Sequence, residues 1–434
     1  MKYRPSRGLV LCLTPLLATA TAGAWAWNKA NDAPMRERAG GDFVNLLKRD
    51  NSGAPHSMGT EEWEKLQKAS RAECRTIVAK LRADFPSLQI EPKPVPAEEN
   101  AFLQLHLLSG PPIGNGPRIG RSLQEILASH AEWNAEAVKA ALAEHAEVVA
   151  KVEHIAALES RSSSEMPESY NGFVGARAAK TCADILLLKA RLAAEAKDEA
   201  EALRLVAATR NLARHFREIE EPTLLAETVA ILIDLSVANC AFEHLLPKLG
   251  RDADLPQWKQ ALGTRGYTPA DFAQVMRGEW NVVAEFYLAP VVLKQAPSDG
   301  DELMQIHASN FAALVAALPG MSWGEFTKQR CEPLQEGFSH LSEQSRGIAK
   351  EFFIGCKAWT KGYVRAASVL ASHQAALNLM MLEKAGENLD GASVEKIMVE
   401  PVSGTRFSYD PKSRTLSPPE SMKEFEVGAV KLPW

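Results

Sequence analysis

Apolar residues recur every three or four positions through the middle of this chain, and this spacing constrains the fold more than any other feature. In the helix predicted over 199–219, Leu205, Leu212, Phe216 and Ile219 fall on one face. Apolar residues make up 46% of the 434 residues and are largely Ala and Leu, which are strong helix formers, whereas aromatic residues make up only 7%. The pattern predicts an all-α body in which such faces pack together.

Capping residues and prolines divide this pattern into separate helices. Thr60, followed by two glutamates, is a start signal, and Pro222 and Pro247 bound one of the later helices. The sequence Lys-Ala-Gly at 384–386 is typical of a helix end, because a basic last turn complements the helix dipole and glycine accepts a left-handed conformation. We expect a multi-helix bundle or an irregular α-solenoid-like array over 60–386, with helices at 60–85, 130–160, 173–196, 199–219 and 223–246.

The character of the sequence changes after residue 386. Short β-type runs occur at 397–399, 406–409 and 415–417, and the intervening EPVSG and DPKS segments are rich in turn-forming residues. These features predict a small β-hairpin and tail over residues 387–434.

The N-terminal residues have the pattern of an export signal. Lys2, Arg4 and Arg7 precede an uncharged apolar run that ends in AWAW. Small residues in its second half favour cleavage, whereas the tryptophans favour retention as a membrane anchor. We therefore interpret residues 1–27 as a signal peptide or signal anchor and residues 28–59 as a linker. Both interpretations place the body outside the cytoplasm, either periplasmic or anchored in the inner membrane.

Three segments of the chain together resemble one family. They are AEENAFLQLHLL near residue 100, the alanine- and leucine-rich block that begins GARAAKTCADILLL, and the ending that contains EKIMVEPVSGTRFSYD. They are similar to a group of uncharacterised exported, mostly helical bacterial proteins with a pseudopilin-like C-terminal tail. Glu400 stands where that tail usually has Asp. The resemblance implies a helical fold and export, and it supplies no catalytic residue.

Charged residues inside apolar helices are expensive to bury unless they are paired. Arg177, Asp184 and Arg191 lie seven apart and therefore on one stripe of their helix. Glu227 and Asp234 have the same spacing two helices further along. We expect a structural ion-pair seam between these helices, with Asp234 bound to Arg177 or Arg191. A catalytic acid with a raised pKa is the alternative for such a carboxyl.

A basic strip lies on the helix between those two. Arg210, Arg214 and Arg217 are close enough in sequence to share a side of the helix. They could bind an anionic group, but we expect them to meet solvent or the acids at 218, 220 and 221.

One cluster of residues has a spacing that suits metal binding. Glu336 and His340 are four apart and Glu343 is three further on, so one helical face would present them together, with Glu332 nearby. No H-E-x-x-H motif and no repeated Glu-x-x-His motif supports this site. A solvated acidic face is the expected interpretation, and these four residues are weak metal candidates.

The cysteines give no pattern of a redox or zinc site. After the export signal they are widely spaced and form no C-x-x-C, so we expect small buried hydrophobic residues and leave their disulfide status open. They are Cys74, Cys182, Cys240, Cys331 and Cys356.

These observations favour a non-enzymatic protein. The net charge of −5 does not suit a phosphate backbone, so we expect no nucleic-acid partner, and no motif indicates a cofactor. The sequence favours an exported helical scaffold or interaction protein of the bacterial cell envelope, with a protein partner and with membrane association if the N-terminal segment is uncleaved. The alternatives are a metal-binding protein or hydrolase that uses the acidic/His face, and an envelope-assembly or secretion-associated component.

Overall fold

The structure is a computed structural model of the whole chain. It describes residues 60–109, 123, 126, 133–164, 166, 176–263, 267–328, 337–351, 356–387, 389 and 398–434. The segments interpreted as an export signal and a linker, 1–27 and 28–59, lie outside the described residues.

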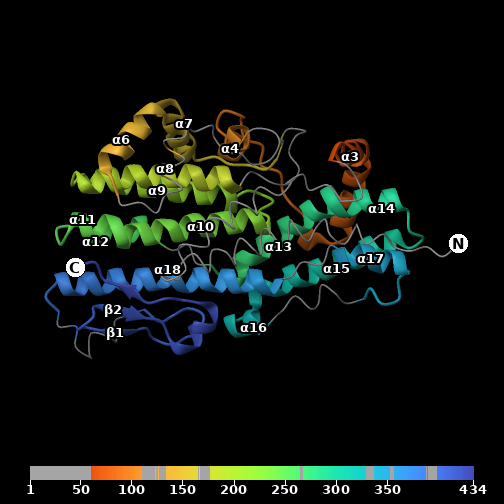
Figure 1. Cartoon of the computed structure of the whole chain (residues 1–434). Coiled ribbons are helices and arrows are strands. Elements are labelled where there is room, and N and C mark those ends of the chain that lie inside the picture. The colour runs from red at the N-terminus through yellow and green to blue at the C-terminus, as the bar shows by residue number, and fades with distance from the viewer. Residues whose placement is uncertain are drawn as a thin grey trace.

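The described chain is all-α with a small antiparallel sheet at its C-terminal end, as the sequence predicts (Figure 1). The first part of the body contains α3 (Thr60–Asp84), η2 (Pro86–Leu88), α4 (Ala101–Ser109), α6 (Ala135–Glu144), α7 (Ala146–Ala157), α8 (Ala176–Glu195), α9 (Glu199–Arg217) and α10 (Leu224–Cys240). The second part contains α11 (Leu246–Leu249), α12 (Leu255–Ala261), α13 (Pro269–Val283), α14 (Ala289–Gln295), α15 (Gly300–Ala317), η5 (Leu318–Gly320), α16 (Trp323–Lys328), α17 (Glu343–Glu351) and α18 (Cys356–Lys384).

Two predicted helix boundaries need correction. The single helix expected over 130–160 is two helices, α6 and α7, which meet at His145, where the backbone leaves the helical region with φ −115° and ψ 30°. The helix expected to end before Pro247 instead continues to Leu249.

Prolines inside the later helices are accommodated by wider turns. The segments Ala241–Leu245 and Ala284–Leu288 are π-helical, and Pro247 and Pro290 each follow two residues after such a segment. A proline lacks an N–H and clashes with the carbonyl four residues earlier. A local π turn shifts this pairing, so each helix passes its proline without ending.

The apolar side chains gather in two cores. The first is built by α4 and α6–α12 with the C-terminal half of α18 and the sheet, and the second by α3, α13–α17 and the N-terminal half of α18. Two long helices contribute to both: α18 runs along the body in Figure 1, and α10 places Ile233 in the first core and Leu235 in the second. The segment Leu224–Leu249 is long and apolar enough to cross a membrane, but it is mostly buried inside this fold.

The C-terminal sheet has one strand more than the predicted hairpin. Strands β1 (Ser408–Asp410), β2 (Thr415–Ser417) and β3 (Val430–Lys431) are antiparallel in the order β1-β2-β3, with Tyr409 opposite Leu416 and Leu416 opposite Val430. A short helical segment, η8 (Glu420–Phe425), separates β2 from β3. The sheet lies against α18, where Arg414 makes a two-pronged ion pair with Glu383 at 2.7 and 2.8 Å.

Glu400 organises the turn that precedes this sheet. It is fully buried, and its carboxylate accepts hydrogen bonds from the backbone N–H of Val402 at 3.1 Å and of Ser403 at 2.6 Å. The EPVSG segment is therefore a self-capped turn, and its acidic residue has a structural role.

The backbone of the connection between α9 and α10 contacts α13 closely at Gly278. A Cβ atom added at Gly278 would lie 2.4 Å from the carbonyl oxygen of Pro222 and 2.7 Å from the carbonyl carbon of Glu221. Both atoms belong to the backbone, so they cannot move aside as the end of a flexible side chain could.

Gly278→Ala is therefore expected to destabilise the protein, by about 1–3 kcal/mol or more. Gly347→Ala is the matched control, since Gly347 also lies within a helix but an added Cβ would meet nothing within 4 Å. The control should be neutral or stabilise by up to about 1 kcal/mol. Chemical denaturation measures both, and equal effects would contradict the close packing at Gly278.

Candidate functional site

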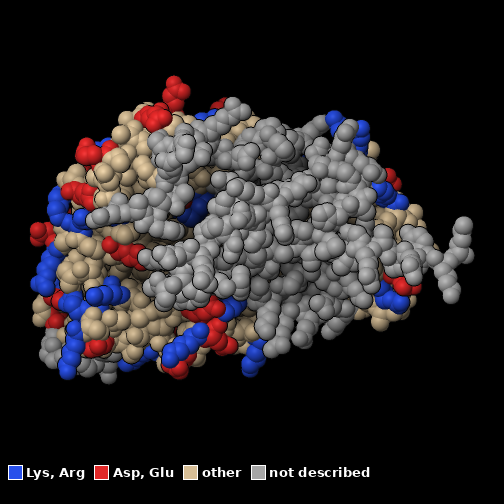
Figure 2. Space-filling model, in the orientation of Figure 1, with Lys and Arg blue, Asp and Glu red and all other residues tan. Residues whose placement is uncertain are grey.

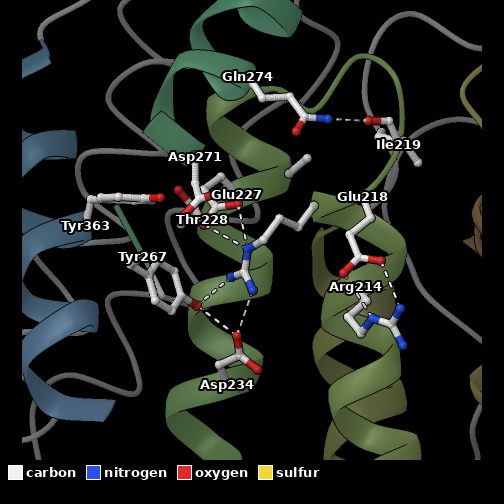
Figure 3. Close-up of polar contacts among 12 residues, drawn as sticks. Arg214, Glu218, Ile219, Glu227, Thr228, Asp234, Tyr267, Asp271, Gln274 and Tyr363 are labelled. Atoms are coloured by element: carbon white, nitrogen blue, oxygen red, sulfur yellow. Dashed lines mark hydrogen bonds and ion pairs between the residues drawn. The ribbon is translucent and has the colours of Figure 1, made fainter. Parts of the chain in front are cut away.

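The most concentrated group of buried charges lies where α9 and α10 meet the second core (Figure 3). Asp234 of α10 is only 3% exposed, and its carboxylate accepts hydrogen bonds from Arg217 Nη1 at 3.0 Å, Arg210 Nε at 3.4 Å and the Tyr267 hydroxyl at 2.8 Å. We call these residues, together with Glu227, the ionic junction.

Arg217 is the centre of the ionic junction. Its Nε donates to both carboxylate oxygens of Glu227, at 3.1 and 3.0 Å, while its Nη2 donates to the Tyr267 hydroxyl at 2.5 Å. The guanidinium carbon also lies 4.5 Å from the centre of the Tyr267 ring, a cation–π distance. One arginine thus joins two acids of α10 and a tyrosine that precedes α13.

The electrostatics of the ionic junction follow from burial and pairing. Burial raises the pKa of the Glu227 carboxyl although Arg217 opposes this shift. Burial by itself would lower the pKa of Arg217, but Glu227, Tyr267 and Asp234 raise it well above its usual value. Two carboxylates and two guanidiniums give formal neutrality, which is the arrangement that makes buried charge tolerable.

Aromatic rings attach the ionic junction to the second core. Tyr267 packs edge-on against Tyr363 of α18 at 5.2 Å, and Phe272 of α13 lies 5.1 Å from Tyr363. The Tyr363 hydroxyl donates to the carbonyl of Thr268, the N-cap of α13, at 3.1 Å. The ionic junction therefore connects α9 and α10 to both α13 and α18.

The two α10 acids of the predicted seam, Glu227 and Asp234, are paired with arginines of α9. Asp184 pairs with Lys180 on its own helix, and Arg191 stacks on Trp133 at 3.8 Å. The side chain of Arg177 lies outside the described side chains. The correction follows from chain connectivity, because helices joined by a short loop pack side by side and α9 directly precedes α10.

A usable signal for the correct partners was present in the sequence. Arg210 and Arg217 are seven apart, the same spacing as Glu227 and Asp234, so two matched stripes face each other across the α9–α10 hairpin. The third member of the basic strip, Arg214, points away and makes a two-pronged pair with Glu218 at 3.0 Å.

Another buried acid, Glu279, is not predicted by the sequence. Glu279 of α13 is 7% exposed, and its carboxylate accepts the backbone N–H of Leu224 at 2.8 Å, at the first turn of α10. Burial raises the pKa of this carboxyl to about 7. The sequence shows only a glutamate between Gly278 and Trp280, which gives no indication of its burial.

The predicted metal candidates are only partly described. His340 Nε2 lies 2.9 Å from Glu302 Oε1 on α15, and Glu343 begins α17. Glu332 and Glu336 lie outside the described residues. Within the part of the chain that the structure describes, no three His, Cys, Asp or Glu side chains gather as metal ligands would.

Three of the cysteines are free thiols in apolar surroundings. Cys74 and Cys182 are buried, Cys240 is half-buried, and burial raises the pKa of the Cys182 and Cys240 thiols to about 12. Such thiols are poor nucleophiles at neutral pH. Cys331 lies outside the described residues, and Cys356 begins α18 with its side chain undescribed.

Fold and site together define an all-α protein whose main buried polar feature, in the described part of the chain, holds helices together. No protein-family model matches this chain, and no curated protein or solved structure matches it significantly.

Asp234→Ala is expected to lower the free energy of unfolding by about 3–5 kcal/mol, because it leaves Arg217, whose side chain is only 19% exposed, with only Glu227 as a charged partner. The comparison variant is Glu136→Ala, which removes an exposed pair with Lys139 and should cost less than about 1 kcal/mol. Urea unfolding gives both values, and a small effect of Asp234→Ala would show that the ionic junction contributes little.

Glu279→Gln is expected to change the pH dependence of stability. The carboxyl has a pKa of about 7 when folded, against 4.5 in its unperturbed state. The folded protein thus binds this proton more tightly, and stability is lost as pH rises from about 4.5 to about 7. Glutamine mimics the protonated acid, so the stability of the variant relative to wild type should increase between pH 5 and pH 8, by at most about 3 kcal/mol. Melting curves at both pH values check this, and a pH-independent difference would contradict it.

Proposed function

We propose that this protein is an exported helical scaffold or interaction protein of the bacterial cell envelope, acting through a protein partner. The observation that carries the proposal is the pairing of its buried charges. Among the described residues, the buried acids Glu227 and Asp234 are candidates for unusual chemistry, and both are bound by Arg217. They join α9, α10 and the second core, which is what a stiff body requires.

The surface is consistent with this role. On the described part of the face in Figure 2, basic and acidic side chains are interspersed, without a large field of one sign. A mixed surface of this kind gives no reason to expect a nucleic-acid partner. The proposal of export is supported by the residue pattern before position 28, where basic residues precede an apolar run.

Two experiments separate this proposal from its alternatives. Metal analysis of the purified full chain should find no stoichiometric iron, zinc or manganese, and a stoichiometric metal would favour the metal-binding protein or hydrolase. Crosslinking in cells, followed by recovery from membranes, should yield a defined protein partner. Recovery of pilus-type assembly proteins would favour the envelope-assembly alternative.

Export is tested by fusing alkaline phosphatase after Trp434. The fusion should be active, because this enzyme requires the oxidising environment outside the cytoplasm. Removing residues 1–27 from the fusion should abolish its activity. A fluorescent protein that matures only in the cytoplasm should give the opposite pattern. An inactive phosphatase with a bright cytoplasmic fusion would reverse the assignment.

A further inference from the structure

Two consecutive glutamates in the connection between α9 and α10 are held by different segments of the chain. Glu220 is bound by residues around position 163, whereas Glu221 is bound by α3. We call residues 218–223 the joint loop.

The contacts of Glu220 form a cradle of uncharged donors. Its Oε1 accepts from the Ser162 hydroxyl at 2.8 Å, the Lys93 N–H at 3.1 Å and the Ser164 hydroxyl at 3.4 Å. Its Oε2 accepts from the N–H of Ser163 at 2.7 Å and from its hydroxyl at 3.1 Å. Four of these five donors belong to the segment 162–164 and fix the joint loop to it, and the fifth is the Lys93 backbone.

Glu221 connects the joint loop to α3. Arg82, in the last turn of α3, donates from Nη2 to Glu221 at 3.2 Å and from Nε to Asn281 of α13 at 2.5 Å. Asn281 in turn donates to the carbonyl of Leu88, just after α3. The end of α3 is thus bound to the joint loop and to α13 by one guanidinium.

The joint loop has little freedom to absorb a displacement. Its backbone lies against Gly278 of α13. Glu279 of α13 accepts a hydrogen bond from the N–H of Leu224, the residue after the joint loop, and Gln274 of α13 donates one to the Ile219 carbonyl. A movement of α3 is therefore passed on through a short, closely packed segment.

We propose that the joint loop couples the position of α3 to the segment 162–164, in parallel with the hydrogen bond that the Lys93 N–H, further along the chain from α3, donates to the Ser164 hydroxyl at 3.2 Å. α3 is the first described helix after residues 1–59, so an event at the N-terminal segment would reach the first core by this route. Arg82, Glu221 and Glu220 are positioning residues in this coupling. This coupling is a property of the folded body and does not require export of the protein.

Hydrogen exchange of the purified full chain, followed by mass spectrometry, tests the coupling. Arg82→Ala should speed exchange of the amides at 162–164 by about two- to thirtyfold, the range that matches typical coupling free energies. The matched control is Arg75→Ala, which removes another ion pair of α3, with Glu285 at 2.9 Å, but leaves the hydrogen bond between Arg82 and Glu221 in place. It should speed exchange within α3 only.

The reverse variant adds an independent check. Coupling is reciprocal, so Glu220→Ala should speed exchange at the end of α3 by a factor similar to that of Arg82→Ala at 162–164. Exchange in α6 serves as the reference for any global loss of stability. If Arg82→Ala does not fold, Arg82→Lys should show a smaller effect, since lysine lacks the second nitrogen that reaches Asn281. Equal exchange at 162–164 in the Arg82 and Arg75 variants would overturn the proposal.

Discussion

The arrangement of the helices depends most on the hydrogen bonds and ion pairs of Arg217. Arg217 is held between Glu227 and Asp234, which lie about two helical turns apart on α10, and it also donates a hydrogen bond to Tyr267. This arrangement is stable only while α9, α10 and the start of α13 keep their positions, because either of the buried acids would be costly if left without its arginine. The ionic junction therefore specifies one packing of these helices, which apolar faces rich in alanine would define less sharply.

The two cores are joined by more than this network. Long helices run through both, and Gly278 allows the backbone of the α9–α10 connection to contact α13 directly. Glu279 caps the start of α10 from outside that helix, and Arg82 brings α3 to the same place. Polar contacts and close backbone packing thus converge on residues 218–224.

The pairing of these buried charges bears on function as well as stability. A carboxyl with a raised pKa is often a catalytic acid, and Glu227 and Glu279 both have raised pKa values. Here each carboxyl is already bound within the fold, Glu227 by Arg217 and Glu279 by the N–H of Leu224. This is the physical basis for proposing a scaffold in place of an enzyme.

The sequence by itself determined the helical class, most helix positions and the small C-terminal sheet, because periodicity, caps and turn residues act locally. It also identified Asp234 as a costly residue that needs a partner. Only the tertiary structure decided which arginine that partner is, since α8 and α9 both carry arginines at suitable spacing and both pack against α10, and the contacts with Asp234 come from Arg210 and Arg217 of α9. The burial of Glu279 and the separate attachments of Glu220 and Glu221 likewise required the fold, because each depends on segments far apart in the chain.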